Sequence, residues 1–384
     1  MNTFLKDYIF LDKLGQGGFA AVFKVRHKSL EYIRAIRVLN DTIANGEEDH
    51  KYQNFLRECK ILLRLGNGSH PNITHIYRPR LLENKAVVEM DYIDGGDMFK
   101  YIVENNGFIE TEEVINLLAS ISSALSYCHY DIYRYCMDRE LDNLKDDPND
   151  GSKIWLDEET IDRLVKKYRV IHNDIHSGNI MRREDGRYVL LDFGLSIEGE
   201  DVVRSSKRNG GAPEFKAPEK WDMANDLSTQ SDIYSFGIVL YSCLAGRVPF
   251  VFDKKNSNPL KAEMDLMNAH QKEMPEPIYG LRENAFEATH PGETYVKDYP
   301  DWLEQIIMKC LEKNPNDRYK DGKELYEDYL RHVKNTNIKS NTFSNQKPIQ
   351  ENPIKECVTA RMWKNNMEYK SLYSDDNNYV YFLQ

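Results

Sequence analysis

The residues best suited to chemistry lie in one stretch, residues 170–194, where His172, Asp174 and Asn179 have the spacing H-x-D-x-x-x-x-N. Asp192 follows a short apolar run that predicts a buried strand. Two carboxylates and an amide at strand ends suit a divalent-metal centre for phosphoryl transfer. In such a centre Asp174 would accept or orient a hydroxyl proton, while Asn179 and Asp192 would offer hard oxygen ligands to Mg²⁺.

This stretch resembles the protein-kinase superfamily, which has an H-R-D-x-x-x-x-N catalytic loop followed by D-F-G, here residues 192–194. The resemblance extends over roughly residues 8–332, and the chain is identified as a divergent member of the eukaryotic-type (Hanks-type) serine/threonine kinases. It implies an α+β bilobal fold, with an antiparallel sheet and one main helix followed by a mainly helical lobe. The expected divisions are 1–93 for the first lobe, 94–334 for the second with an insert at about 131–169, and 335–384 for a polar tail.

Residues 8–25 predict a strand, a glycine turn and a second strand, in which the backbone could approach a triphosphate closely. The family pattern is G-x-G-x-x-G-x-V, and Ala20 replaces its third glycine. The resemblance implies that backbone atoms between Asp91 and Ile93 bind the base, behind which Met90 lies. Its ATP-binding residues would be Gly15, Gly17, Gly18, Val22, Ala35, Arg37, Met90, Asp91, Ile93, Asp97 and Met181.

The strand expected at residues 33–39 resembles the family's V-A-I-K strand, but Arg37 occupies the lysine position. The resemblance implies that Arg37 grips the phosphates and that Glu58, on a helix expected at 51–65, braces it. Arginine keeps the charge but is longer, planar and forked. The nearest lysines are Lys24 and Lys28, and strand alternation together with the family layout predicts that both point away from the phosphates.

Three further positions depart from the family pattern. Asn173 replaces the arginine that pairs with a loop phosphate, and Ala212 replaces a threonine that contacts the catalytic aspartate. His176 stands where a lysine usually faces the γ-phosphate, so the expected catalytic set is Asp174, Arg37, Glu58 and His176. Ser205 and Ser206 lie among basic residues and fit either a phosphorylation site or a plain exposed loop.

Three predictions concern long-range structure in the second lobe. The resemblance implies that Asp232 anchors the backbone of the catalytic loop and that Glu219 pairs with Arg318. About forty residues separate His129 from Val170, far more than an ordinary connection. They predict a helix at 157–168 with Ile161, Leu164, Val165 and Tyr168 on one face, which belongs either to a solvated excursion or to a docking or regulatory element.

Composition limits the remaining possibilities. The net charge of −11 argues against nucleic-acid binding as the main role. The six cysteines are scattered without a C-x-x-C pair, which indicates reduced intracellular thiols. No signal peptide or membrane-spanning run is recognisable, so a cytoplasmic protein is expected.

The sequence therefore predicts an ATP- and Mg²⁺-dependent kinase that acts on serine or threonine in protein substrates. A pseudokinase scaffold is an alternative, supported by Ala20, Arg37 and Ala212. A small-molecule kinase of the aminoglycoside or choline type is another, because D-x-H-x-G-N around His176 also occurs there. The A-P-E motif and Arg318 speak against that second alternative.

Overall fold

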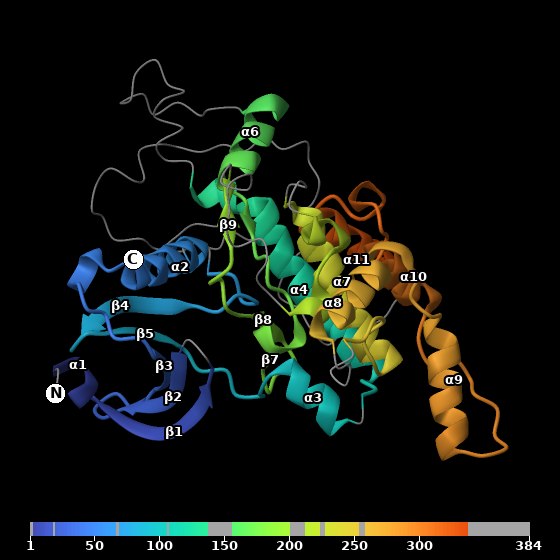
Figure 1. Ribbon diagram of the computed structural model, residues 1–384, viewed down its shortest axis with the longest axis horizontal. Coiled ribbons are helices and arrows are strands. Elements are labelled where there is room, and N and C mark those ends of the chain that lie inside the picture. Colours follow the sequence, from blue (N-terminus) through green and yellow to red (C-terminus); the bar gives the residue numbers. More distant parts are fainter. Residues whose placement is uncertain are drawn as a thin grey trace, which may run out of the picture.

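The first lobe is built on a five-stranded antiparallel sheet with strand order β1-β2-β3-β5-β4 (Figure 1). The structure is a computed structural model that describes residues 3–17, 20–66, 69–105, 107–136, 156–199, 212–222, 227–252 and 258–336. A short helix, α1, precedes the sheet. The elements are α1 (Thr3–Lys6), β1 (Tyr8–Gln16), β2 (Ala20–His27), β3 (Ile33–Leu39), β4 (Ile76–Leu82) and β5 (Lys85–Asp91).

The main helix of this lobe, α2 (His50–Gly66), packs against β4 and covers one side of the sheet (Figure 1). Its apolar residues recur at helical spacing, and Phe55, Cys59 and Leu62 are buried. Asp49 begins the helix by accepting a hydrogen bond from the backbone N–H of Lys51 at 2.9 Å. The helix therefore presents Glu58, which lies on its buried side, to the sheet.

The second lobe is mainly helical, and α4 and α7 form its buried centre. Helix α11 packs along α4, and α10 packs against α7. Gly322 begins α11 so close to α4 that an added Cβ would lie 2.2 Å from the carbonyl carbon of Leu125. The helices are α3 (Met98–Glu104), α4 (Thr111–His129), α7 (Thr229–Ala245), α8 (Pro259–Lys272), α9 (Ile278–Thr289), α10 (Asp301–Cys310) and α11 (Gly322–Thr336).

Two short strand pairs of the second lobe pack on α4 and flank the chemical motifs. Strand β6 (Val170–Ile171) pairs with β9 (Ile197–Glu198), and β7 (Ile180–Arg182) pairs with β8 (Tyr188–Leu190). Gly186 has φ +83° in the turn between β7 and β8, where glycine is unstrained. The two pairs hold the catalytic loop and the D-F-G residues at adjacent strand ends.

Helix α6 (Glu158–Tyr168) is the described part of the insert and lies beside β9 (Figure 1). Asp157 caps it by accepting from the N–H of Thr160 at 2.8 Å. Its predicted apolar face is confirmed: all four residues pack with Tyr133, although Val165 and Tyr168 are only partly buried. Residues 137–155 of the insert lie outside the described residues, and both roles given for the insert stay predictions.

The α+β bilobal fold is confirmed by the sheet order and the helical second lobe. The domain boundaries remain predictions, and the tail beyond residue 336, like Gly18, Ser205 and Ser206, lies outside the described residues. Across the described ranges, no helix combines the length and apolar character needed to cross a bilayer. The five cysteines within those ranges are free thiols.

The predicted pair of Glu219 and Arg318 forms a buried bidentate ion pair, with both N–O distances 2.9 Å. Arg318 also donates to the carbonyl oxygens of Gln230, Glu312 and Lys313, so all five of its N–H groups have acceptors. Burial raises the pKa of Glu219, but the hydrogen bonds and charge of Arg318 outweigh it and hold the pKa below its usual value. The pair ties the segment after residue 212 to the helical lobe.

We expect Arg318→Met to lower the free energy of unfolding by about 3–5 kcal/mol, because it leaves the Glu219 carboxylate buried without its counter-ion. Urea unfolding followed by circular dichroism measures the change. Arg331→Met is the control, since Arg331 forms an exposed pair with Asp328 and such a pair contributes only about 0.5 kcal/mol. Equal effects of the two substitutions would contradict the prediction.

Candidate active site

The catalytic loop is held from below by the carboxylate of Asp232, which is buried in α7. It accepts the backbone N–H of His172 at 2.6 Å and that of Asn173 at 2.8 Å, which confirms the predicted anchor. His129 at the end of α4 adds a third contact at 3.0 Å through Nε2. Burial raises the pKa of Asp232, but these hydrogen bonds outweigh it and hold the pKa below its ordinary value.

His129 was not recognised in the sequence, although it links three distant parts of the second lobe. Its Nδ1 accepts from the N–H of Gly322 at 3.1 Å, so Nε2 carries the proton that is donated to Asp232. The close approach of α11 to α4 at Gly322 makes this bridge possible. A histidine at a helix end carries no signal of such a role in sequence alone.

Asp174 and Asn179 face each other across the catalytic loop. The amide nitrogen of Asn179 donates to the carbonyl oxygen of Asp174 at 2.9 Å and to its Oδ2 at 3.2 Å. The second carboxylate oxygen, Oδ1, faces Nε2 of His176 at 3.8 Å, which is too long for a hydrogen bond. Asp174 is therefore oriented on one side by the amide and has a ring nitrogen on the other.

His176 also has a local structural role. Its Nδ1 accepts the N–H of Gly178 at 3.1 Å, so the neutral ring carries its proton on Nε2, toward Asp174. Burial lowers the pKa of His176 and outweighs the opposing charge of Asp174. At neutral pH the ring is therefore neutral, unlike the lysine that the resemblance places at this position.

Within the D-F-G residues, the Asp192 side chain faces solvent and the Phe193 side chain is buried. Asp192 is exposed, has φ +51°, and accepts the N–H of Gly194 at 3.1 Å. The Phe193 ring packs edge-on against the His172 ring, with centroids 4.6 Å apart. His172 in turn donates through Nε2 to the carbonyl oxygen of Leu191 at 2.7 Å. The metal-ligand candidate and the catalytic loop are thus joined by a buried ring pair.

Arg37 reaches from β3 to α2 and forms an ion pair and hydrogen bond with Glu58. Burial lowers the pKa of Arg37, but the carboxylates of Glu58 and Asp192 outweigh it and raise the pKa. Arg37, Glu58 and Asp192 therefore form one charged group, at the place where the resemblance positions a lysine, a helix glutamate and a metal ligand.

The glycine hairpin closes between β1 and β2, where Gly15 lies opposite Val22 and the N–H of Gly17 bonds the carbonyl oxygen of Ala20. An added Cβ on Gly15 or Gly17 would meet nothing within 4 Å, so no other group of the described residues packs against the backbone at these two positions. Asn40, after β3, donates through its amide to the carbonyl oxygen of Gly17 at 2.8 Å. This tie to the hairpin was missed in the sequence, because Asn at a strand end is usual in turns.

The remaining predicted nucleotide residues line the junction of the lobes. Ala35 pairs with Met90 across β3 and β5, and Ile93 is buried at the crossing. The backbones of Asp97 and Met181 of β7 form an isolated antiparallel β-bridge, so these two residues lie side by side. The Asp97 carboxylate caps α3 by accepting the N–H of Lys100 at 2.9 Å. Its expected contact with ribose remains a prediction.

The expectation for the two nearby lysines was right for Lys28, whose ammonium binds the carbonyl oxygen of Lys6. For Lys24 the alternation argument was wrong. Lys24 lies opposite Ala35 and therefore shares the face of Ala35 and Arg37. Its ammonium nevertheless lies 4.3 Å from the centroid of the Tyr92 ring, so its position along the strand directs it to the junction of the lobes.

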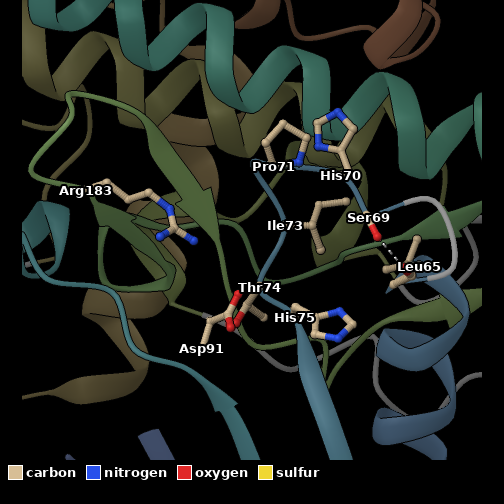
Figure 2. A pocket seen from close by; sticks show the side chains of 10 residues that line it. Leu65, Ser69, His70, Pro71, Ile73, Thr74, His75, Asp91 and Arg183 are labelled. Carbon is tan, nitrogen blue, oxygen red and sulfur yellow. Dashed lines mark hydrogen bonds between the residues drawn. The ribbon is translucent and has the colours of Figure 1, made fainter. Parts of the chain in front are cut away.

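A pocket of about 250 Å³ lies behind this junction (Figure 2). Of the predicted nucleotide residues, Asp91 lines it, and its carboxylate accepts from the Tyr77 hydroxyl at 2.9 Å. The N–H of Asp91 bonds the carbonyl oxygen of His75. The carboxylate and the N–H of Asp91 are thus both engaged by β4 and the residue before it, and the expected contact of the backbone of residues 91–93 with the base remains a prediction. The pocket walls include Leu65, His70, Thr74, His75, Asp91 and Arg183.

The residues around the loop fit a divalent cation shared with phosphates. The nitrogen of the Asn179 amide faces Asp174, which leaves the amide oxygen for a cation, and Asp192 offers an exposed carboxylate. Within the described residues, no group of three or more His, Cys, Asp and Glu side chains could hold a metal by itself. Mg²⁺ needs no such cage, because it commonly takes one or two protein oxygens and completes its shell with phosphates and water.

Comparison with known proteins agrees with this geometry. The protein kinase domain family matches residues 8–137 and 160–332, and thus omits most of the insert. A probable serine/threonine-protein kinase of Clostridium acetobutylicum is 26% identical over 332 residues, which cover 86% of this chain and 40% of that protein. The probable serine/threonine-protein kinase PknB of Lactococcus lactis is 24% identical over 329 residues, covering 85% and 42%. The chain thus spans about two fifths of the length of these relatives.

The Asp232 anchor generates a stability prediction. Asp232→Asn should lower the free energy of unfolding by about 2–5 kcal/mol, because an amide nitrogen cannot accept the N–H groups that the carboxylate accepts. Asp301→Asn serves as the control, since the Asp301 side chain is 79% exposed and forms a surface pair with Lys297. Chemical denaturation of both variants measures the difference, and an Asp232→Asn protein as stable as the control would show that the anchor is dispensable.

Proposed function

This chain belongs to the protein kinase domain family, and we propose that it transfers the γ-phosphoryl group of ATP to serine or threonine hydroxyls of proteins, with Mg²⁺ as the metal. One observation carries the proposal. Asp174 and Asn179 are hydrogen-bonded beside an exposed Asp192, and Asp192 acts electrostatically on an Arg37 that is paired with Glu58. The arrangement combines a proton acceptor, metal ligands and a phosphate-binding cation.

Asp174 is the residue that would accept or orient the proton of the attacking hydroxyl. Its Oδ2 is held by the Asn179 amide, so the carboxylate has a defined orientation before substrate arrives. Its Oδ1 faces His176, whose neutral ring adds no positive charge that would weaken the base. In phosphoryl transfer the protein contributes mainly positioning and charge stabilisation, and these contacts supply the positioning.

Asn179 and Asp192 would hold Mg²⁺, and Arg37 would bind the phosphates while Glu58 braces it. A bound divalent ion would neutralise charge on the phosphate oxygens. The unobstructed backbone at Gly15 and Gly17, with Asn40 tying the hairpin, would allow a triphosphate to approach closely. Arg37 is partly buried, with 20% of its side chain exposed, and this partial burial strengthens its interaction with a bound anion relative to a fully solvated cation.

A protein is favoured as acceptor over a small molecule. The buried pair of Glu219 and Arg318 stabilises the segment after Ala212, against which a peptide would lie. Ser235 adds a hydrogen bond to the carbonyl oxygen of Phe215 at 2.7 Å. A small-molecule acceptor would not need this support. The relatives' names further support a serine/threonine kinase. The free thiols fit a cytoplasmic protein.

Incubation of the full chain with labelled ATP, Mg²⁺ and a generic protein substrate tests the proposal. We expect transfer to protein, and a loss on the order of a thousandfold for Asp192→Asn or Asp174→Asn, because each removes a group engaged in the transition state. Asp301→Asn is the control on an exposed carboxylate. Unchanged activity of Asp192→Asn would refute the metal assignment. Rapid phosphorylation of an aminoglycoside, with none of any protein, would refute the acceptor class.

Arg37 generates a sharper prediction. Because its planar guanidinium is engaged by Glu58, it should satisfy the phosphates less well than a lysine ammonium would. Arg37→Lys should raise kcat by about tenfold or more, and Arg37→Ala should nearly abolish transfer.

Arg34→Lys is the matched control for Arg37→Lys, since Arg34 is in the same strand and stacks between Tyr32 and Tyr77. Steady-state kinetics should place the control within about twofold of the natural sequence. A slower Arg37→Lys protein would mean that the pocket is shaped for arginine. If the natural sequence and Arg37→Lys both bind ATP without transferring phosphate, the scaffold alternative replaces the proposed activity.

A further inference from the structure

Lys220 is a buried lysine that the sequence does not distinguish from the lysines around it. It follows Glu219 in a short 3₁₀ turn (Pro218–Trp221), and only 5% of its surface is exposed. Its ammonium donates to the carbonyl oxygen of Asn173 at 2.7 Å. Burying an ammonium is costly unless the surroundings compensate for its charge. The residues around Lys220 must therefore compensate for the cost of burying its charge.

The surroundings of Lys220 are charged on two sides. Asp232 of α7 and Asp174 of the catalytic loop favour its charged form, as does the adjacent Glu219, while Lys216 of the same segment opposes it. Burial outweighs the carboxylates and lowers the pKa of Lys220 to about 8. Glu219 is already paired with Arg318. The ammonium of Lys220 therefore interacts electrostatically mainly with the carboxylates of Asp232 and Asp174. Because its pKa is about 8, Lys220 is positively charged at neutral pH.

The carbonyl that Lys220 binds belongs to a residue in an uncommon backbone conformation. Asn173 has φ +67°, the left-handed conformation that few residues other than glycine and asparagine adopt readily. Its N–H is held by Asp232, and its side-chain nitrogen donates to the carbonyl oxygen of Leu195 at 3.1 Å. Lys220 binds the remaining backbone group, in the peptide that leads into Asp174. Rotation of that peptide would change the direction of the Asp174 side chain.

The catalytic loop itself carries uncharged residues where the resembling family has cations. Asn173 takes the place of an arginine, and His176 that of a lysine. The His176 ring is neutral at neutral pH, as described above. Lys220 brings a positive charge to this loop from the segment that follows the A-P-E residues.

We propose that Lys220 is a positioning residue for Asp174, which holds the Asn173–Asp174 peptide through its hydrogen bond and supplies the positive charge that the loop lacks. Lys220 lies beneath the loop and is buried, so it touches neither the acceptor nor the nucleotide. It acts through Asp174. The proposal rests on the proposed function in so far as Asp174 serves phosphoryl transfer.

The test compares Lys220→Met, Lys220→Gln and Lys220→Arg in the full chain. Glutamine keeps a donor for the buried carbonyl but has no charge, while arginine keeps the charge. We expect kcat to fall by about tenfold or more in Lys220→Met and Lys220→Gln, with KM for ATP within about twofold, and Lys220→Arg to regain much of the loss. Normal kcat in Lys220→Gln would overturn the charge requirement, even if Lys220→Met failed to fold.

Lys313→Met is the matched control. Lys313 is a second lysine whose pKa burial lowers to about 8, and it donates to the carbonyl oxygen of His270 at 2.9 Å, away from the catalytic loop. Its loss should reduce thermal stability but leave kcat within about twofold. Equal losses of kcat in the Lys313 and Lys220 variants would reduce Lys220 to a structural residue and overturn the proposal.

A pH profile gives a readout that a structural role would not change. Lys220 loses its positive charge as the pH rises through about 8, so kcat of the natural sequence should decline above that pH. Arginine stays charged, and Lys220→Arg should therefore keep its kcat to higher pH. Identical profiles above pH 8 for the two proteins would contradict the proposed role of the charge.

Amide hydrogen exchange separates this proposal from the proposed function. If the natural sequence transfers no phosphate from ATP with Mg²⁺, the kinase proposal fails, but the role of Lys220 remains measurable. Lys220→Met, which removes the donor as well as the charge, should then exchange the His172 and Asn173 amides about tenfold faster than the natural sequence does, and Lys313→Met should not. Unchanged protection of these amides in Lys220→Met would overturn the positioning role.

Discussion

The arrangement of the active site depends on one buried carboxylate. Asp232 of α7 accepts the N–H groups of two consecutive catalytic-loop residues. It also accepts the ring proton of His129, which ends α4. Its negative charge is held inside the lobe because three donors replace the water it has lost. His129 connects it to the start of α11, so helix packing in the second lobe and the conformation of the catalytic loop are set together.

Positive charge reaches the active site through tertiary contacts rather than from the catalytic loop itself. Arg37 comes from β3 and pairs with Glu58 of α2, while Lys220 comes from the segment after Ala212. Both are buried enough that burial by itself would favour their neutral forms. Nearby carboxylates favour the charged form of each residue. The positive charge that each brings to the active site therefore depends on the packing that places it beside those carboxylates.

The structure explains two departures from the family pattern, at Asn173 and His176. Asn173 lacks the charge of the expected arginine, but asparagine tolerates the left-handed conformation found there, and its amide ties the loop to Leu195. His176 lacks the charge of a lysine, but its ring nitrogen accepts the N–H of Gly178 and shapes the turn before Asn179. Both residues serve the shape of the loop, and neither supplies a cation at neutral pH.

The sequence by itself determined the order and identity of the chemical groups: Asp174, Asn179 and Asp192 at their spacing, Arg37 on its strand, and the pair of Glu219 with Arg318. The spacing and apolar periodicity that located the first four of these groups are local properties of the chain, whereas the pairing of Glu219 with Arg318, 99 positions apart, followed from the family resemblance. Only the tertiary structure decided that His129 meets Gly322, 193 positions away, and that Lys220 turns back to Asn173. It also decided that Lys24 shares the face of Ala35 and Arg37, which alternation had not predicted correctly. The direction of a long side chain depends on what packs around it, and neither residue type nor periodicity contains that information.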